Sequence, residues 1–265
     1  MRTLAVIIAR AGSRGLRDKC VLPLCGRPII AYTISHAQQS RLVDAIVLSS
    51  DSVRALAIGR AAGISVIQRP GHLATDATPV ADVVRHATRV CEQSDGRCFD
   101  AVVVLYGNIP LRGDGAIDRC IQLMEQTGCD SVRTVAPVGK MHPDWMHRLD
   151  GDHLVQFRPN SIHRRQDLEP LYYHDAAVIV VKRDLLMASE NSSDPHAFFG
   201  ADRRAVIQEE HDTVDIDGLD DFYRAEALIR LRNETVFLDP GPTGASRRPA
   251  FTAAVQYGAA RASSP

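Results

Sequence analysis

The sequence predicts an α/β protein built on a mostly parallel, twisted sheet that is flanked by helices and carries a small inserted arm. Short apolar runs of strand length alternate with amphipathic segments of helix length, and Gly-rich or charged loops follow several of the runs. Strands that alternate with helices form right-handed βαβ units, whose strands run parallel. The chain has 265 residues, 45% hydrophobic and 24% charged, which is typical of a globular protein with a large core.

The expected strands are continuous apolar runs, as in a sheet that is buried on both faces. They cover residues 4–9, 44–50, 64–68, 99–105, 130–136 and 176–181, while residues 213–217 form either a short strand or a loop. The expected helices cover residues 29–37, 52–62, 79–91, 115–126 and 219–231. Pro28 suits the start of the first helix, Asp51 or Ser52 caps the second, and Gly63 ends it.

A single domain is expected over residues 1–236. Within it, residues 138–171 break the alternation of strands and helices, because this stretch is rich in His, Arg and Pro with only a short strand-like piece at 154–157. We interpret it as an arm inserted in the sheet domain and as an oligomer contact. Residues 239–265 are rich in Pro, Gly, Ala and Ser without periodicity, so we expect a poorly ordered tail there.

Charge and cysteine usage exclude several classes of protein. The formal net charge of −1 argues against broad binding to nucleic acid or to a membrane surface. The N-terminal apolar run is too short for a signal peptide or a membrane span. The six cysteines form no CxxC pair, so they are interpreted as reduced thiols of a cytoplasmic protein. A zinc site is disfavoured because neither Cys nor His shows ligand spacing.

A cationic loop with two glycines follows the first expected strand. Gly12 and Gly15 allow tight turns that present backbone N–H groups to an anion. The cations that would neutralise a triphosphate and stabilise a departing pyrophosphate are Arg10, Arg14, Arg17 and Lys19. The spacing matches neither the P-loop nor the dinucleotide-binding motif. A solvated basic loop is the alternative, but the position directly after a buried strand favours a phosphate site.

Two aspartates flank Ile216 near the end of the domain. Side chains at i and i+2 of an extended segment point to the same face, so the carboxylates of Asp215 and Asp217 are expected side by side. Such a pair suits Mg²⁺, which takes its remaining ligands from phosphate and water. The alternative is an exposed polar strand edge, with Asp220 capping the following helix.

Several ordered motifs resemble the acylneuraminate cytidylyltransferase (CMP-sialic acid synthetase) family. The first is Ile8-Ala-Arg-Ala-Gly-Ser-Arg-Gly-Leu16 followed by Lys19. Others lie at residues 26–34, 47–51, 69–70, 73–76, 110–112, 165–166 and 214–217, so the resemblance covers about residues 3–230. It implies a Rossmann-like nucleotidyltransferase fold, CTP as a substrate, Mg²⁺ on Asp215 and Asp217, and a homodimer formed through the arm.

The resemblance also assigns residues to the nucleotide. Those implied to bind it are Arg10, Ala11, Gly12, Ser13, Arg14, Lys19, Arg69 and Asp76, and those implied in catalysis are Arg14, Lys19 and Asp217. For Arg69 the alternative is a surface charge before a turn-forming proline. For Asp76 it is an N-cap of the helix that follows Pro79, a role compatible with a place in the site.

The acceptor side departs from the family pattern. Tyr106 stands where the family commonly has a sugar-binding glutamine, and Asn108 is a nearby amide. The remaining residues implied to bind the acceptor are Arg164, Arg165, Gln166 and Asp175. Asp175 replaces a common asparagine, and a carboxylate there would repel the acceptor's own carboxylate unless it is protonated or paired; His174 is the candidate partner. Trp145 is interpreted either as packing within the arm or as an apolar wall for acyl groups.

The expected reaction is Mg²⁺-dependent transfer of CMP from CTP to the anomeric hydroxyl of a nonulosonic, sialic-acid-like sugar, with release of pyrophosphate. One alternative keeps the fold and changes the substrates, as in a CMP-Kdo-type or other sugar nucleotidyltransferase. A nucleotide panel separates these two. Another alternative, motivated by Tyr106 and Asp175, is a catalytically impaired nucleotide-sugar-binding protein, which would bind CTP without forming pyrophosphate.

Overall fold

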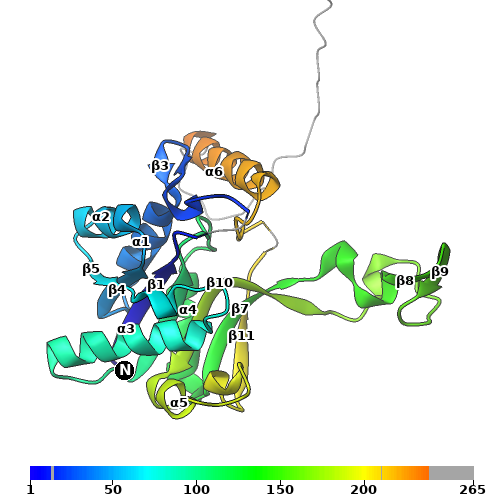
Figure 1. Ribbon diagram of the computed structural model, residues 1–265. Coiled ribbons are helices and arrows are strands. Elements are labelled where there is room, and N and C mark those ends of the chain that lie inside the picture. Colours follow the sequence, from blue (N-terminus) through cyan, green and yellow to red (C-terminus); the bar gives the residue numbers. More distant parts are fainter. Residues whose placement is uncertain (13–14, 210, 239–265) are drawn as a thin grey trace, which may run out of the picture.

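A seven-stranded sheet forms the centre of the protein in the computed structural model, which describes residues 1–12, 15–209 and 211–238 (Figure 1). The strand order is β11-β7-β10-β6-β1-β4-β5. The strands are β1 (Thr3–Ala9), β4 (Ala45–Ser50), β5 (Ser65–Gln68), β6 (Ala101–Tyr106), β7 (Ser131–Pro137), β10 (Tyr172–Lys182) and β11 (Arg203–Ile207). The tail expected at 239–265 lies outside the described residues.

One strand of this sheet runs against the others. β1 pairs in parallel with β4 and β6, β4 with β5, and β7 with β11. β10 is antiparallel to both of its neighbours, β6 and β7. The prediction of a mostly parallel sheet is therefore confirmed. Because β10 is reversed, its first residues lie at the edge where the parallel strands end.

Helices cover both faces of the sheet (Figure 1). Helices α1 (Ile29–Gln39), α2 (Val53–Ala61) and α4 (Ala116–Thr127) pack on one face, and α3 (Val80–Asp95) and α5 (Arg183–Ala188) pack on the other. Successive side chains of a strand point to opposite faces, so β1 supplies Ala5 and Ile7 to the first core and Leu4 and Val6 to the second. This double burial explains the unbroken apolar runs of the sequence.

A third apolar cluster lies beyond the carboxyl ends of the strands. It joins α6 (Leu219–Leu238) to α1 and to the short hairpin of β2 (Pro23–Leu24) and β3 (Arg27–Pro28). Val214 and Ile216 are buried in this cluster, and Val214 forms a β-bridge with Leu111. The segment 213–217 is thus extended but is not a strand of the main sheet. Its apolar side chains anchor it beside the loop that follows β6.

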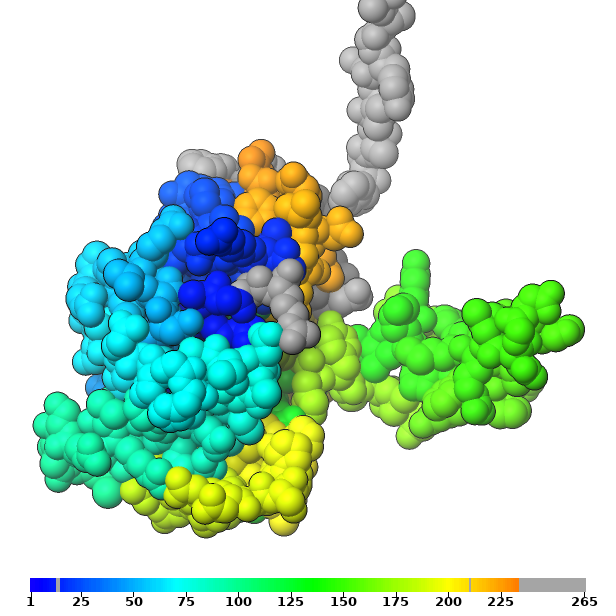
Figure 2. Space-filling view, viewed as in Figure 1, coloured from blue at the N-terminus to red at the C-terminus, as the bar shows by residue number. Residues whose placement is uncertain are grey.

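The arm of residues 138–171 stands out from the body as a separate lobe (Figure 2). It contains a two-stranded hairpin of β8 (His147–Asp150) and β9 (His153–Gln156). Its base is closed where the Val138 N–H donates to the Leu171 carbonyl at 3.0 Å. Trp145 donates from Nε1 to the Ile162 carbonyl at 2.9 Å, which supports packing within the arm over a wall for the acceptor.

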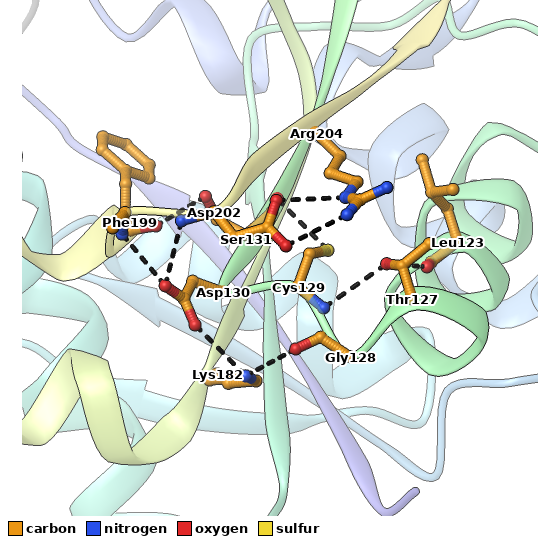
Figure 3. Close-up of polar contacts among 11 residues, drawn as sticks. Leu123, Thr127, Gly128, Cys129, Asp130, Ser131, Lys182, Phe199, Asp202 and Arg204 are labelled. Carbon is orange, nitrogen blue, oxygen red and sulfur yellow. Dashed lines mark hydrogen bonds and ion pairs between the residues drawn. The ribbon is translucent and has the colours of Figure 1, made fainter.

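A polar network fastens the opposite edge of the sheet, where β7 begins and β10 ends (Figure 3). Asp130 accepts backbone N–H groups of Ala201 and Asp202 at 2.9 and 3.1 Å. It also accepts from Lys182 Nζ at 3.1 Å, and the same ammonium donates to the Gly128 carbonyl. These bonds hold the reversed strand and the edge strand β11 in place, far from the carboxyl ends of the parallel strands.

Strand β11 and helix α5 are among the elements that the sequence did not predict. Strand β11 is only five residues long and carries two arginines, so it lacks the apolar run expected of a buried strand; it lies at the sheet edge instead. Helix α5 has six residues, too few to show helical periodicity. Among the described residues, no helix has the length and apolarity needed to cross a bilayer.

Candidate active site

The strand order places a binding crevice between β1 and β6. After β1 the chain builds β4 and β5 on one side, and it then crosses to form β6 on the other side. Ligands of open α/β sheets bind at such a switch point, beyond the carboxyl ends of the strands. A cavity of about 330 Å³ lies there. Its lining comes from the ends of β1 and β6, the segment before α3, and both aspartates of the 213–217 segment.

The cationic loop borders this cavity. Arg10 forms an ion pair with Asp76 across it, and both residues line it. The Ala11 N–H donates to Asp51 Oδ1 at 2.9 Å, which fixes the start of the loop against the end of β4. Gly12 is exposed. Ser13 and Arg14, to which the sequence also assigned roles, lie outside the described residues.

Arg69 is a buried residue of the site rather than a surface charge, since it is only 6% exposed. Its Nη2 donates to the Ser49 carbonyl at 2.7 Å, and its Nε donates to Ser49 Oγ at 3.3 Å. Burial lowers the pKa of Arg69, while the nearby charge of Asp51 opposes that shift. The guanidinium therefore brings a fixed positive charge to the cavity wall.

Asp76 takes part in the site and does not cap α3. That helix begins after Pro79 and has no hydrogen bond from a capping side chain. Asp76 instead lines the cavity and pairs with Arg10. The capping alternative for Asp76 is therefore wrong, and its carboxylate is directed toward the cationic loop.

Asp215 and Asp217 are exposed, while the alternate residues Val214 and Ile216 are buried. This is the pattern expected of an extended segment with one polar face. Asp217 Oδ1 accepts from Lys19 Nζ at 2.5 Å, and Asp215 accepts from the amide of Asn108. Loss of hydration raises the pKa of Asp215, and the negative charge of Asp217 raises it further. The two carboxylates therefore form a concentrated negative site that favours a cation.

Gly15 lets the cationic loop touch the aspartate segment. A Cβ atom at this position would lie 2.1 Å from the carbonyl oxygen of Asp217, which no side chain can accommodate. The segment is also held to the loop after β6, because the Ile216 N–H donates to the Asn108 carbonyl at 3.2 Å. Three loops that are distant in the sequence thus meet through backbone contacts at one point.

The two carboxylates fit a magnesium ion that shares its coordination with a nucleotide. Mg²⁺ is usually bound by one or two protein carboxylates together with phosphate oxygens and water. In the described part of the chain, no three His, Cys, Asp or Glu side chains are grouped to hold a metal by themselves. The donor set of Asp215 and Asp217 therefore matches a substrate-assisted Mg²⁺ site better than a structural metal site.

Tyr106 and Asn108 lie at the end of β6 and line the cavity. Burial raises the pKa of the Tyr106 phenol, and the charge of Asp215 adds to the shift, so the phenol is held neutral beside the carboxylates. The main chain between them turns at Gly107, whose N–H donates to the Ile8 carbonyl at 2.9 Å. Both residues assigned to the acceptor side of β6 are thus near the nucleotide cavity.

Arg112 was quoted as part of a motif, and the structure gives it a positioning role. It is buried and donates to four carbonyl or hydroxyl oxygens around it, with distances from 2.7 to 3.2 Å. The acceptors are the carbonyls of Tyr106, Ile109 and Ala177 and the hydroxyl of Thr33. Burial lowers its pKa to about 9. This guanidinium ties the end of β6 to β10 and α1.

Asp175 is buried, with 6% of its surface exposed. Its carboxylate accepts from the hydroxyl of Thr134, from Gln208 Nε2 at 2.5 Å and from the Ala177 N–H at 3.0 Å. The pairing suggested for His174 is wrong, because its ring accepts from Arg133 Nη1 at 2.9 Å instead. Asp175 borders a second cavity of about 180 Å³, which adjoins the first because Asp215 lines both.

Gln208 is a site residue that the sequence did not indicate. Its side chain is buried, its Oε1 accepts the Gly113 N–H at 2.9 Å, and its Nε2 donates to Asp175 and to Thr213 Oγ1. It therefore couples Asp175 on β10 to Thr213 at the start of the aspartate segment. No sequence motif marks it, since it lies one residue beyond an edge strand that was itself not predicted.

Arg164, Arg165 and Gln166 lie on the arm and not at the cavity. Arg165 and Gln166 belong to a short 3₁₀ turn, Arg165–Asp167, and Arg164 pairs with Asp167 at 2.7 Å. The lobe that carries them projects away from the nucleotide cavity (Figure 2). The residues lining the two cavities at Asp215 include none of the three.

Comparison with known proteins assigns the chain to a family. Residues 4–190 match the cytidylyltransferase family, and the chain belongs to this family of nucleotidyltransferases. The chain is 31% identical over 240 residues to a CMP-N,N'-diacetyllegionaminic acid synthase of Legionella pneumophila, an alignment that covers 89% of this chain and all of that protein. The family resemblance identified from the motifs is therefore confirmed.

A second relative is an N-acylneuraminate cytidylyltransferase of Streptococcus agalactiae, which is 29% identical over 251 residues. The alignment covers 91% of this chain and 58% of that protein, so the chain spans little more than half of its length. A solved structure of a CMP:2-keto-3-deoxy-manno-octonic acid synthetase complexed with CTP superposes with a TM-score of 0.66 at 16% identity. It covers 88% of this chain and all of that one, and it confirms the nucleotidyltransferase fold.

Proposed function

We propose that this protein transfers CMP from CTP to the anomeric hydroxyl of a nonulosonic acid and releases pyrophosphate. The observation that carries the proposal is the meeting of a cationic loop and a carboxylate pair in one cavity, where Lys19 touches Asp217. The names of the two relatives support a nonulosonic acceptor. The CTP-bound synthetase of the same fold supports the nucleotide.

The chain's own residues act mainly by positioning and charge. Backbone N–H groups of the loop and the cations Arg10, Arg14 and Lys19 bind the triphosphate, and Arg69 adds a fixed charge from the wall. Arg14 and Lys19 stabilise the negative charge that develops on the leaving pyrophosphate. Phosphoryl-type transfers need little covalent chemistry from the protein, so a nearby general base is not essential to this arrangement.

Asp215 and Asp217 would hold Mg²⁺, which would polarise the α-phosphate and shield charge as the acceptor hydroxyl approaches. The exposed position of both carboxylates lets phosphate oxygens complete the coordination. Loss of hydration raises the pKa of Asp215 and the like charge of Asp217 raises it further, and a bound cation would offset both effects.

A pyrophosphate-release assay tests the proposal. CTP, UTP and GTP are compared with N,N'-diacetyllegionaminic acid, N-acetylneuraminic acid and 2-keto-3-deoxy-manno-octonic acid as acceptors. Activity is expected with CTP and a nine-carbon acid. Preference for UTP or GTP would overturn the nucleotide assignment, and preference for the eight-carbon acid would favour the CMP-Kdo alternative. Tight binding of CTP with no pyrophosphate from any acid would indicate an impaired enzyme.

The variant Asp217→Ala tests the metal assignment. The side chain is 74% exposed, so its removal should leave the fold intact while abolishing pyrophosphate release. Asp220→Ala is the matched control, because this exposed aspartate is the second residue of α6 and lies three positions after Asp217. Wild-type turnover by Asp217→Ala would remove Asp217 from the site.

We also propose that the arm forms a homodimer and completes the partner's acceptor site. The arm exposes a group of large apolar side chains, which water-facing surfaces rarely gather; they are Met141, Met146, Leu149, Leu154, Val155 and Phe157. Arg164, Arg165 and Gln166 lie on this same lobe. These three residues do not line the cavities of their own chain, so we propose that they bind the acceptor in the cavity of the partner subunit.

Mixing two inactive variants tests the exchange of arms. One variant carries Asp217→Ala, and the other carries alanine at residues 164, 165 and 166. In a mixed dimer, one site has an intact carboxylate pair and receives an intact arm, so activity should return after the subunits re-equilibrate. Activity that stays absent, or a fully active monomer by light scattering, would contradict the proposal.

A cytoplasmic location is part of the proposal. All six cysteines are free thiols, and disulfides are rare in reducing compartments. Activity that is unchanged by reductant and lost on oxidation would support this location.

A further inference from the structure

Two arginines and a histidine, with no acidic partner for either arginine among the described residues, gather around Phe199 beside β7, β10 and β11. Arg133 points to the face opposite Val132, and its guanidinium lies over the ring of Phe199. Arg203 approaches the same ring from β11. His174 on β10 accepts a hydrogen bond from Arg133 at 2.9 Å. These groups have no assigned role in nucleotide binding.

Arg133 is fixed in orientation, but one of its hydrogen-bond donors has no partner among the described residues. Its Nε–H is buried and has no hydrogen-bond partner among the described residues. Burial lowers the pKa of Arg133 to about 10, and the positive charge of Arg203 contributes to that shift. A guanidinium that has no carboxylate partner among the described residues and lies beside a second cation favours an anion. Stacking on Phe199 keeps the planar group in one orientation.

The cluster lies beside the reacting centre. Arg133 donates from Nη1 to His174 Nε2 at 2.9 Å. His174 lines the smaller cavity together with Asp215. An acceptor whose hydroxyl meets the α-phosphate near Asp215 would therefore extend toward Arg133.

We propose that Arg133, oriented by His174 and Phe199, binds the carboxylate of the acceptor within the same chain. This inference rests on the proposed function and makes a carboxylic acid next to the reacting carbon a requirement for the acceptor. Guanidinium and carboxylate form two parallel hydrogen bonds. The positive charge of Arg203 near the same ring strengthens the binding of this anion.

Arg133 suits this role better than Arg164. Arg164 is already engaged by the carboxylate of Asp167 through two hydrogen bonds at 2.7 and 3.1 Å. The hydrogen-bond partner of Arg133 is the neutral imidazole of His174, whose pKa is lowered by burial and then by Arg133 itself. A substrate carboxylate therefore displaces no ion pair when it binds Arg133.

The test compares two acceptors, N-acetylneuraminic acid and its C1 carboxamide, in wild-type protein and four variants. Wild type is expected to prefer the acid by about 10- to 100-fold in kcat/KM, the range for a charged hydrogen bond. In Arg133→Gln this preference should fall below about threefold. The KM for CTP and the binding of CTP should not change. Arg133→Lys should recover part of the preference, because lysine keeps the positive charge but cannot form the two parallel hydrogen bonds of a guanidinium.

Arg204→Gln is the matched control. Arg204 lies on the adjacent strand β11 and pairs with Asp202 at 3.0 Å. Its substitution should leave kcat/KM for both acceptors unchanged. An unchanged preference for the acid in a folded Arg133→Gln protein would overturn the inference, as would loss of that preference in Arg165→Gln alone. A raised KM for CTP would assign Arg133 to the phosphates instead. Protein that binds CTP and releases no pyrophosphate with any acid would overturn the proposed function and, with it, this inference.

Discussion

The Lys19 ammonium lies 2.5 Å from Asp217 Oδ1, joining residues that are 198 positions apart in the sequence. The lysine thus occupies one oxygen of the carboxylate pair assigned to the metal. A bound triphosphate offers Lys19 a more highly charged partner. Nucleotide and divalent ion should therefore bind cooperatively, because the nucleotide draws Lys19 away from Asp217.

Substitution of Lys19 by methionine should separate these two roles. Without its cation, Asp217 is available to a divalent ion, so Mn²⁺ used as a probe should bind the nucleotide-free protein about threefold or more tightly, the effect of one exposed ion pair. Pyrophosphate release should nevertheless be lost. Electron paramagnetic resonance titration measures the first effect, with Arg54→Met on α2 as the control. Weaker Mn²⁺ binding in Lys19→Met would contradict the competition.

Alanine at position 15 should damage the site without adding a polar group. Its Cβ would lie 2.1 Å from the Asp217 carbonyl oxygen, so the loop and the aspartate segment must separate. We expect CTP affinity to fall about tenfold or more and stability to fall by about 1–3 kcal/mol, as in other overpacked sites. Gly12→Ala meets no atom within 4 Å and should lose less affinity. Calorimetric titration with CTP distinguishes the two, and equal losses would show that only loop flexibility matters.

The pair Asp175 and Gln208 should tolerate exchange of donor and acceptor better than either single change. Asp175→Asn places an amide N–H₂ group against Gln208 Nε2, and Gln208→Glu places two carboxylates together. Each should cost about 1–3 kcal/mol because a buried polar group loses its partner. The double variant Asp175→Asn, Gln208→Glu restores a donor facing an acceptor and keeps the net charge. Urea unfolding gives the coupling energy, and simple additivity would show that this bond does not order the segment.

The ion pair of Glu92 and Arg183 should contribute stability that depends on pH. Burial opposes ionisation of Glu92, but bonds from Arg183 and the Phe99 N–H outweigh it and lower the pKa of Glu92. The folded-state pKa lies below the unfolded value of about 4.3. The contribution is therefore complete above pH 4.3 and is lost as the pH falls through the lowered pKa.

Arg183→Gln tests that sign. Its deficit in unfolding free energy should be largest near pH 7 and should shrink toward pH 3. Chemical unfolding at several pH values measures this, and Arg204→Gln provides a comparison at an exposed pair. A deficit that grows as the pH falls would contradict the assignment.

The sequence contained most of the nucleotide side because those residues follow buried strands. Arg10 and Lys19 come after β1, and Asp215 and Asp217 alternate with buried residues, so local pattern was enough to place them. Asp175 was harder, because its partners come from β7, the end of β11 and the following loop. A carboxylate that looks repulsive in the sequence is stabilised by neutral donors that no local pattern connects to it.

The surroundings of Arg133 could not be predicted from the local sequence either. It stands inside an expected strand, where an isolated arginine suggests only an edge or a solvent-facing position. Its significance depends on Phe199 and His174, which are brought to it by β10 and by a 3₁₀ turn, Ala197–Phe199. The order of strands in the sheet, which local periodicity does not determine, creates that cluster.

The reversed strand β10 has a consequence for how this enzyme can diversify. The arm leaves the sheet where β7 ends and returns where β10 begins. It is therefore inserted at the edge of the sheet that borders the proposed acceptor site. A lengthened, shortened or rebuilt arm would reshape that rim while leaving the strands that hold the nucleotide undisturbed. Acceptor choice and nucleotide choice can thus change independently within one polypeptide.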